Sequence, residues 1–174
     1  MRQKKFLVLV SLAALGWSHV CFADDLFGIA MKQPLNVQEC IARQGSYLPD
    51  DHSQCFKWPA DSAKSEAPPR DGTIIVNVPL QDRPDFMSGA DVEVGMKAGL
   101  VVSLSARTHG AERDTRDLEA LEHAFGKSDP QYVFDGLNSY QSIRANWQLA
   151  DGSKVYFNSS EFGRYNGLVR IQAP

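Results

Sequence analysis

The 174-residue sequence has few of the side chains and motifs that usually carry enzyme chemistry. It contains four histidines and no G-x-S-x-G nucleophile elbow. Beyond residue 23 the histidines are His52, His109 and His123, and none stands at a recognised spacing from acids or serines. We therefore predict no catalytic residue, no metal ligand and no cofactor-binding residue, and we expect no cofactor.

An excess of basic residues is also missing. The chain has 18 Lys and Arg against 21 Asp and Glu, and its basic residues form no dense run. Nucleic acids and anionic lipids are bound through basic patches that neutralise their phosphates. We therefore expect no nucleic acid partner.

No apolar run is long enough to span a bilayer. A spanning helix needs about 20 apolar residues, whereas Phe6–Trp17 has only 12. Basic residues precede this run, and Cys21-Phe22-Ala23 follows it with small residues at both positions that a signal peptidase reads. Residues 1–23 are thus predicted to be a cleavable signal peptide, cut after Ala23, and the alternative is an uncleaved anchor.

Export would change the charge and the environment of the chain. Removal of Arg2, Lys4 and Lys5 lowers the 18 basic residues to 15 and leaves the 21 acids, a net charge of −6. The residues before Cys21 do not form a lipobox, which disfavours a lipid-anchored form. We expect a periplasmic or secreted protein with no stable membrane span in its mature form.

Only two cysteines follow the predicted cleavage site, Cys40 and Cys55. An even count in an exported chain indicates a disulfide, which would close a loop of about 15 residues. A redox pair would more often have the spacing C-x-x-C. A metal site would need further ligands besides the two cysteines and His52. These remain the alternatives.

The apolar spacing divides the chain into two regions. Residues 24–71 form a loop-rich head with a short strand at Leu26–Met31, a short helix near 37–41, and a Pro-containing tether after Ser53. Residues 72–174 form a sheet domain, and 24–174 are expected to be one structural unit.

Period-two alternation marks the strands of the second region, at 74–78, 92–96, 102–106, 143–149, 155–157 and 168–172. Lys97-Ala98-Gly99 and Asp151-Gly152 supply hairpin turns, and a helix with Asp114 as its N-cap ends at Gly126. The pattern predicts an α+β fold, an antiparallel β-sheet of about five to six strands in the order β-β-β-α-β-β-β, with one main helix packed on one face.

The face of this sheet away from the helix would be open. The same alternation places a mixture of amides, cations and one tyrosine on it: Arg144, Asn146, Gln148, Lys154, Tyr156, Arg170 and Gln172. Tyrosine and arginine are enriched in protein interfaces, although any solvated sheet face must be polar. This set is the candidate binding face.

Two further stretches stand out within residues 73–173, Phe125-Gly126-Lys127 with Pro130, and Trp147 to Gly152. With these stretches, the region resembles small exported bacterial domains shaped like the β-lactamase-inhibitor protein and the outer-membrane assembly lipoprotein BamE. This resemblance implies a bacterial periplasmic adaptor or inhibitor that binds another protein through a sheet face or loops.

The sequence thus favours an exported non-enzymatic binding, inhibitor or adaptor protein acting on a protein or envelope component. Contacts would lie on the open sheet face or on the loop from Gln81 to Ala90. The alternative is a small cell-envelope hydrolase, for which Ser103, Ser105, His109 and Asp114 could form a Ser-His-Asp set.

Overall fold

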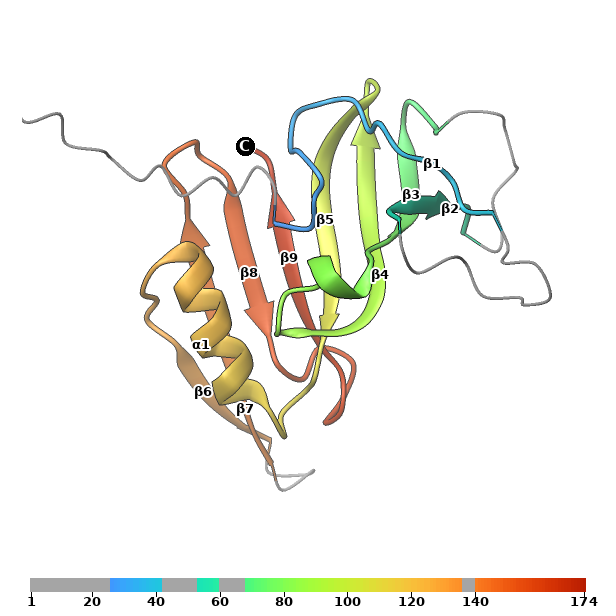
Figure 1. Cartoon of the computed structure of the whole chain (residues 1–174). Coiled ribbons are helices and arrows are strands. Elements are labelled where there is room, and N and C mark those ends of the chain that lie inside the picture. Colours follow the sequence, from blue (N-terminus) through green and yellow to red (C-terminus); the bar gives the residue numbers. More distant parts are fainter. Residues whose placement is uncertain (1–25, 42–52, 60–67, 136–139) are drawn as a thin grey trace, which may run out of the picture.

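Nine strands and one α-helix make up the computed structural model, which describes residues 26–41, 53–59, 68–135 and 140–174 (Figure 1). The strands are β1 (Gln38–Glu39), β2 (Cys55–Lys57), β3 (Gly72–Asn77), β4 (Met87–Lys97), β5 (Leu100–Thr108), β6 (Gln131–Asp135), β7 (Tyr140–Gln148), β8 (Lys154–Asn158) and β9 (Gly167–Gln172). They form one sheet in the order β1-β2-β3-β4-β5-β9-β8-β7-β6. Only the β1–β2 pair is parallel among these described strands.

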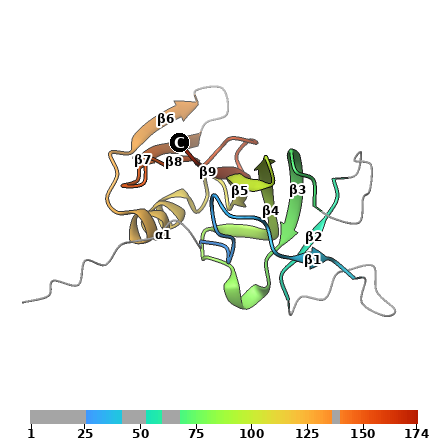
Figure 2. The same ribbon diagram turned by 90° about the horizontal axis from the view of Figure 1, so that it is seen from above.

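The sheet buries one row of apolar side chains from each long strand. Figures 1 and 2 show helix α1 (Asp114–Phe125), the segment 26–37 and the connection that holds the 3-10 helix η2 (Leu80–Asp82) on the same side of the sheet. These elements add their own buried side chains to the core: Phe27, Ile29, Met31, Phe86, Leu118 and Leu121. No described helix or strand covers the opposite side, which we call the open face.

The helix is confirmed, with a difference at its start. It ends at Gly126, whose φ of 91° suits glycine, as predicted. Asp114 is the first helical residue rather than the N-cap, and Arg113 precedes it without a side-chain capping bond. At the other end Trp147 Nε1 donates to the carbonyl of Gly126 at 2.8 Å, which fixes α1 against β7.

Both predicted hairpins are present. Ala98 and Gly99 have φ of 52° and 81°, so the β4–β5 turn has positive φ at both central residues. In the β7–β8 turn only Gly152 has positive φ, because Leu149 and Ser153 close a wider turn through Leu149 N–H to Ser153 O at 2.8 Å.

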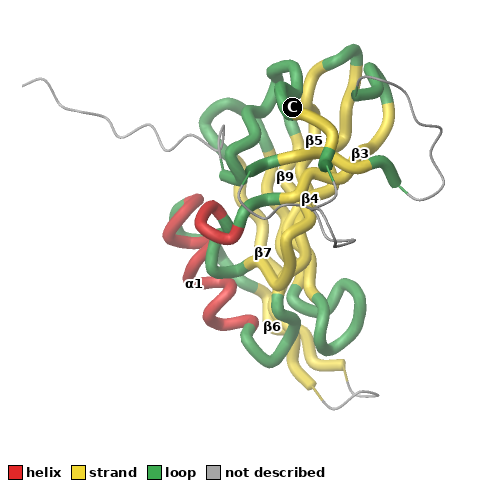
Figure 3. Tube along the Cα trace, turned by 45° about the vertical axis from the view of Figure 1, so that its right-hand side comes forward, coloured by secondary structure: helices red, strands yellow, loops and turns green. Residues whose placement is uncertain are grey.

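The predicted fold class is wrong. The structure is mostly β, a single nine-stranded mixed sheet with one 12-residue helix, and not an α+β fold of five to six strands (Figure 3). The prediction missed β6, since residues 131–135 follow Pro130 and show no buried apolar row. It also missed β1 and β2, which are too short to show a period.

The head differs from its prediction in two places. Leu26–Met31 forms turns rather than a strand, yet Phe27, Ile29 and Met31 are buried beneath the sheet. The short helix expected near 37–41 is absent, because Gln38 and Glu39 extend as β1 beside β2. Since β2 pairs with β3, the head shares the sheet of the second region.

The disulfide is confirmed. Cys40 and Cys55 are joined, and their Cα atoms lie 4.8 Å apart. The described residues include no helix long and apolar enough to cross a membrane. The predicted signal peptide and its cut after Ala23 lie outside the described residues.

Candidate functional site

The seven residues of the predicted binding face all lie on the open face, on β7, β8 and β9. Pairing aligns them in rows that cross the strands: Gln148, Lys154 and Gln172 in one, and Asn146, Tyr156 and Arg170 in the next. Arg144 stands one row further along β7, opposite Asn158. Tyr156 is half-buried and the other six are exposed.

These rows surround a shallow hollow of about 280 Å³. Six of the predicted residues line it, namely all but Arg144, together with Trp147 and Val155. Tyr156 is held in place by its hydroxyl, which donates to Glu161 Oε2 at 3.3 Å. The sheet backbone therefore fixes the positions of these polar groups, and little ordering would be needed on binding.

Positive charge gathers along this half of the open face. The next strand, β5, continues the rows with Ser105 beside Arg170 and Arg107 beside Leu168. Four cationic residues therefore lie on neighbouring strands. We call them the basic strip: Arg107, Arg144, Lys154 and Arg170. All four are exposed, and none forms an ion pair with an acid among the described residues.

Two members of the basic strip are nevertheless positioned by neutral groups. Arg107 stacks 4.1 Å from the ring centroid of Phe162, and Arg170 Nε donates to Ser105 Oγ at 3.2 Å. Such contacts order the guanidinium groups without neutralising them. Sequence reasoning missed Arg107, although its place at the end of the 102–106 alternation could have shown it.

Acidic residues occupy the adjoining strand. Asp91 and Glu93 are exposed on β4, and Glu93 pairs with Ser105 across the β4–β5 ladder. Asp91 bonds the ammonium of Lys57 at 2.7 Å. The open face is therefore divided into a positive half on β5, β9, β8 and β7 and a more negative half on β4.

A second polar arrangement lies where β5 meets α1. The carboxylate of Asp117 is fully buried and accepts two bonds from His109, from the backbone N–H at 2.9 Å and from ring Nδ1 at 2.9 Å. Burial raises the pKa of Asp117, and the bonds to His109 oppose that shift. This contact orients the imidazole. When the ring is neutral and its proton is on Nδ1, the Nε2 lone pair is available to accept a proton.

The imidazole of His109 lines a hollow of about 340 Å³ beside η2. Ser88, Asp85 and Arg113 line the same hollow. The Ser-His-Asp set suggested by the sequence is not assembled, because Ser103 and Ser105 lie on the open face and Asp117, not Asp114, bonds the histidine. His123 is exposed on α1, and His52 is outside the described residues.

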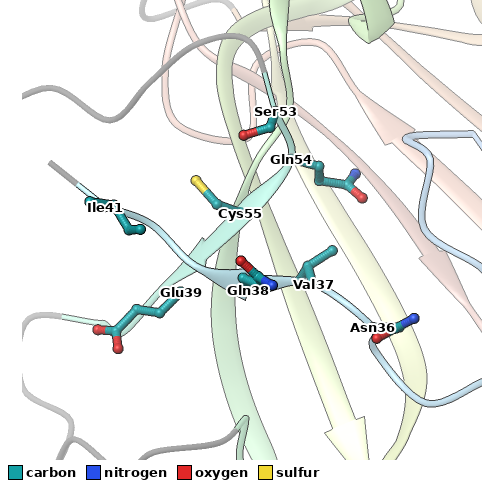
Figure 4. A pocket seen from close by; sticks show the side chains of 8 residues that line it. All are labelled: Asn36, Val37, Gln38, Glu39, Ile41, Ser53, Gln54 and Cys55. Atoms are coloured by element: carbon teal, nitrogen blue, oxygen red, sulfur yellow. The ribbon is translucent and has the colours of Figure 1, made fainter. Parts of the chain in front are cut away.

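A larger hollow, about 490 Å³, lies beside the disulfide between β1 and β2. Figure 4 shows its lining side chains, with Glu39 and Gln54 pointing away from one another. Among the described residues that line it, Glu39 is the one with a charged side chain. No group of three or more His, Cys, Asp or Glu that could hold a metal occurs in the described parts of the chain.

Comparison with known proteins adds no neighbour. No protein-family model, no curated protein and no solved structure matches the chain. The resemblance to small exported bacterial domains therefore stays a prediction.

Proposed function

We propose that this chain is an exported binding protein whose basic strip holds the acidic surface of a protein partner. The observation that carries the proposal is the alignment of the predicted residues on three neighbouring strands of an uncovered sheet face. Six of them surround one hollow, and the four cations of the basic strip, which form no ion pair within the described part of the chain, stand among amides and a tyrosine.

Charge gives this surface its expected selectivity. An acidic partner would be attracted to the basic strip and repelled by Asp91 and Glu93 on the next strand, so the division of the face sets an orientation. The tyrosine and arginine side chains belong to the types that contribute most to protein interfaces. A backbone that is already ordered lowers the entropic cost of association.

The proposed location is supported by coarser features. The disulfide fits an oxidising compartment, and export by a cleaved signal peptide into the periplasm is part of this proposal. Inhibition of an enzyme is one way in which the same face would act.

The proposal is tested by charge reversal on the open face. We expect Arg144→Glu with Arg170→Glu to weaken binding of a partner captured from the periplasm at least about tenfold, which corresponds to ~1.4 kcal/mol. Tyr156→Ala should weaken it too. The affinity of the purified pair should also fall between about 50 and about 300 mM salt, because the strip is exposed.

Arg116→Glu is the control, since Arg116 is exposed on α1 and its reversal changes the charge by as much as each single reversal on the open face. If it weakens binding as much as the double reversal does, general charge rather than the basic strip governs binding, and the proposal is wrong.

A small cell-envelope hydrolase is the second candidate, favoured by the buried bond between Asp117 and His109. In that reaction the nucleophile would be water or the Ser88 hydroxyl. His109 Nε2 would take the proton of this nucleophile as its oxygen attacks an ester or amide carbonyl. Turnover of a panel of chromogenic esters that disappears in His109→Ala, but not in Arg144→Glu, would support this candidate over binding.

A further inference from the structure

Strand β6 is an edge of the described sheet, and it has few of the features that normally discourage pairing. It contains no lysine, no proline and no bulge, and its register with β7 is regular over all five residues. Two large aromatic side chains project from it into solvent, Tyr132 with 60% and Phe134 with 70% of their surface exposed. Unprotected edges of this kind are templates for another strand.

The hydrogen bonds of β7 show which backbone groups of β6 point outward. Ile143 uses its carbonyl for Ser159 N–H at 2.9 Å and its N–H for Ser159 Oγ at 2.8 Å, so both groups face the β8 side. Ile143 is opposite Tyr132. In an antiparallel ladder such a pair is not hydrogen-bonded, and the N–H and C=O of Tyr132 therefore point to the free edge.

The same holds two residues further along. Phe134 is opposite Gln141, so its N–H and C=O also point outward. Val133, opposite Ser142, uses its backbone groups toward β7 instead. The free edge of β6 thus offers two donors and two acceptors, all on the residues that carry the exposed aromatic rings.

We infer that β6 is a docking strand for a second copy of this chain, paired antiparallel about a twofold axis at Val133. In this register Tyr132 of each copy lies opposite Phe134 of the other. The outward groups of both residues are then used, forming four backbone hydrogen bonds across the axis. A shift that places Tyr132 opposite itself would set Phe134 against Pro130, which has no N–H to donate.

Side chains favour the same register. Tyr132 and Phe134 project on one side of β6, and a twofold axis normal to the sheet keeps them on one side in both copies. Each Tyr132 would face a Phe134, an aromatic cross-strand pair of the kind that stabilises sheets. The basic strip lies on β5, β9, β8 and β7 of each copy, so one continuous sheet would present two strips on the same face.

The register is tested by cysteine cross-linking of the purified protein. Val133 opposes itself in a non-hydrogen-bonded pair, where Cα atoms lie about 4.5 Å apart, within the range that a disulfide spans. We expect Val133→Cys to form a covalent dimer under mild oxidation. Thr73→Cys is the matched control, because Thr73 is exposed on β3, a strand outside the proposed interface, and it should stay monomeric.

Self-association of the unmodified protein is measured by sedimentation velocity from about 10 µM to about 1 mM, a range that detects weak pairing. We expect a reversible dimer that disappears in Tyr132→Lys with Phe134→Lys. It should persist in Leu80→Lys, which changes an exposed apolar residue on η2.

A monomer throughout this range would overturn the inference, as would equal cross-linking of Val133→Cys and Thr73→Cys. Capture of an extended peptide by β6 without self-association would also overturn it.

Discussion

At the scale of single residues, Asp117 joins α1 to the end of β5 by hydrogen bonds. Its carboxylate accepts the backbone N–H of His109, at the end of β5, and the ring Nδ1 of the same residue. A buried acceptor of two bonds is costly to remove, because both donors lose their partner. Its position on the inner side of α1 was not predicted, since an acid near a helix start is usually solvated.

We predict that Asp117→Ala lowers the free energy of unfolding by about 1–3 kcal/mol, the range for a buried donor left without an acceptor. Urea unfolding followed by circular dichroism measures this. Glu119→Ala on the exposed side of α1 is the control and should change stability by less than about 0.5 kcal/mol. Equal effects of the two variants would show that the contact between Asp117 and His109 contributes nothing to stability.

At the scale of elements, the end of α1 is stabilised by one carboxylate. Glu122 accepts from Lys127 Nζ at 2.5 Å, from Ser128 N–H at 3.1 Å and from Ser128 Oγ at 2.9 Å. The bond from the Lys127 ammonium, followed by those from Ser128, lowers the pKa of Glu122 to about 2. Ionised Glu122 thus connects the last helical turn to the chain that leads into β6.

The pH dependence follows from this lowered pKa. Because the folded-state value lies below the ordinary 4.5, the contribution of Glu122 to stability is present above about pH 4.5 and is lost as the pH falls toward 2. We predict that the wild type is more stable than Glu122→Gln at about pH 6 and that the difference shrinks by about pH 2.5. Urea midpoints of both proteins at the two pH values measure it, and a constant difference would contradict the assignment.

Sequence patterns predicted elements well where an apolar row is buried and poorly elsewhere. Rows such as Ile74 with Val76, or Val155 with Phe157, gave strands that the structure confirms. β6 could not be found in this way, because Tyr132 and Phe134 are exposed and no buried row marks the strand. The same exposure is what makes β6 a candidate docking edge.

At the scale of the whole molecule, the predicted face could be assembled from the sequence because alternation and two hairpin turns fix the register of neighbouring strands. The turn at Gly152 aligns β7 with β8, and that alignment brings Asn146 opposite Tyr156. The fold class could not be obtained in the same way. Pairing of β5 with β9, and of β2 with β3, joins segments distant in sequence, and no local pattern reports such contacts.

Removal of the disulfide would show how the head and the rest of the sheet depend on each other. It closes a loop of 15 residues at the β1–β2 edge, whereas the basic strip lies on β5, β9, β8 and β7. In the chain-entropy model, closing a loop of this length stabilises the folded state by about 3 kcal/mol.

We predict that Cys40→Ser with Cys55→Ser loses about this amount of stability, because the unfolded chain gains freedom and Phe56, buried on β2, is held less firmly. The antiparallel sheet from β3 to β6 should remain, since neither cysteine belongs to the cluster of buried apolar residues that forms its core, and partner binding at the basic strip should be unchanged at 25 °C. Urea unfolding and a binding titration of the double variant measure the two parts, with reduced wild-type protein as the control. Loss of binding in a variant that is still folded would show that the head shapes the open face, and the site would then have to extend to β1 and β2.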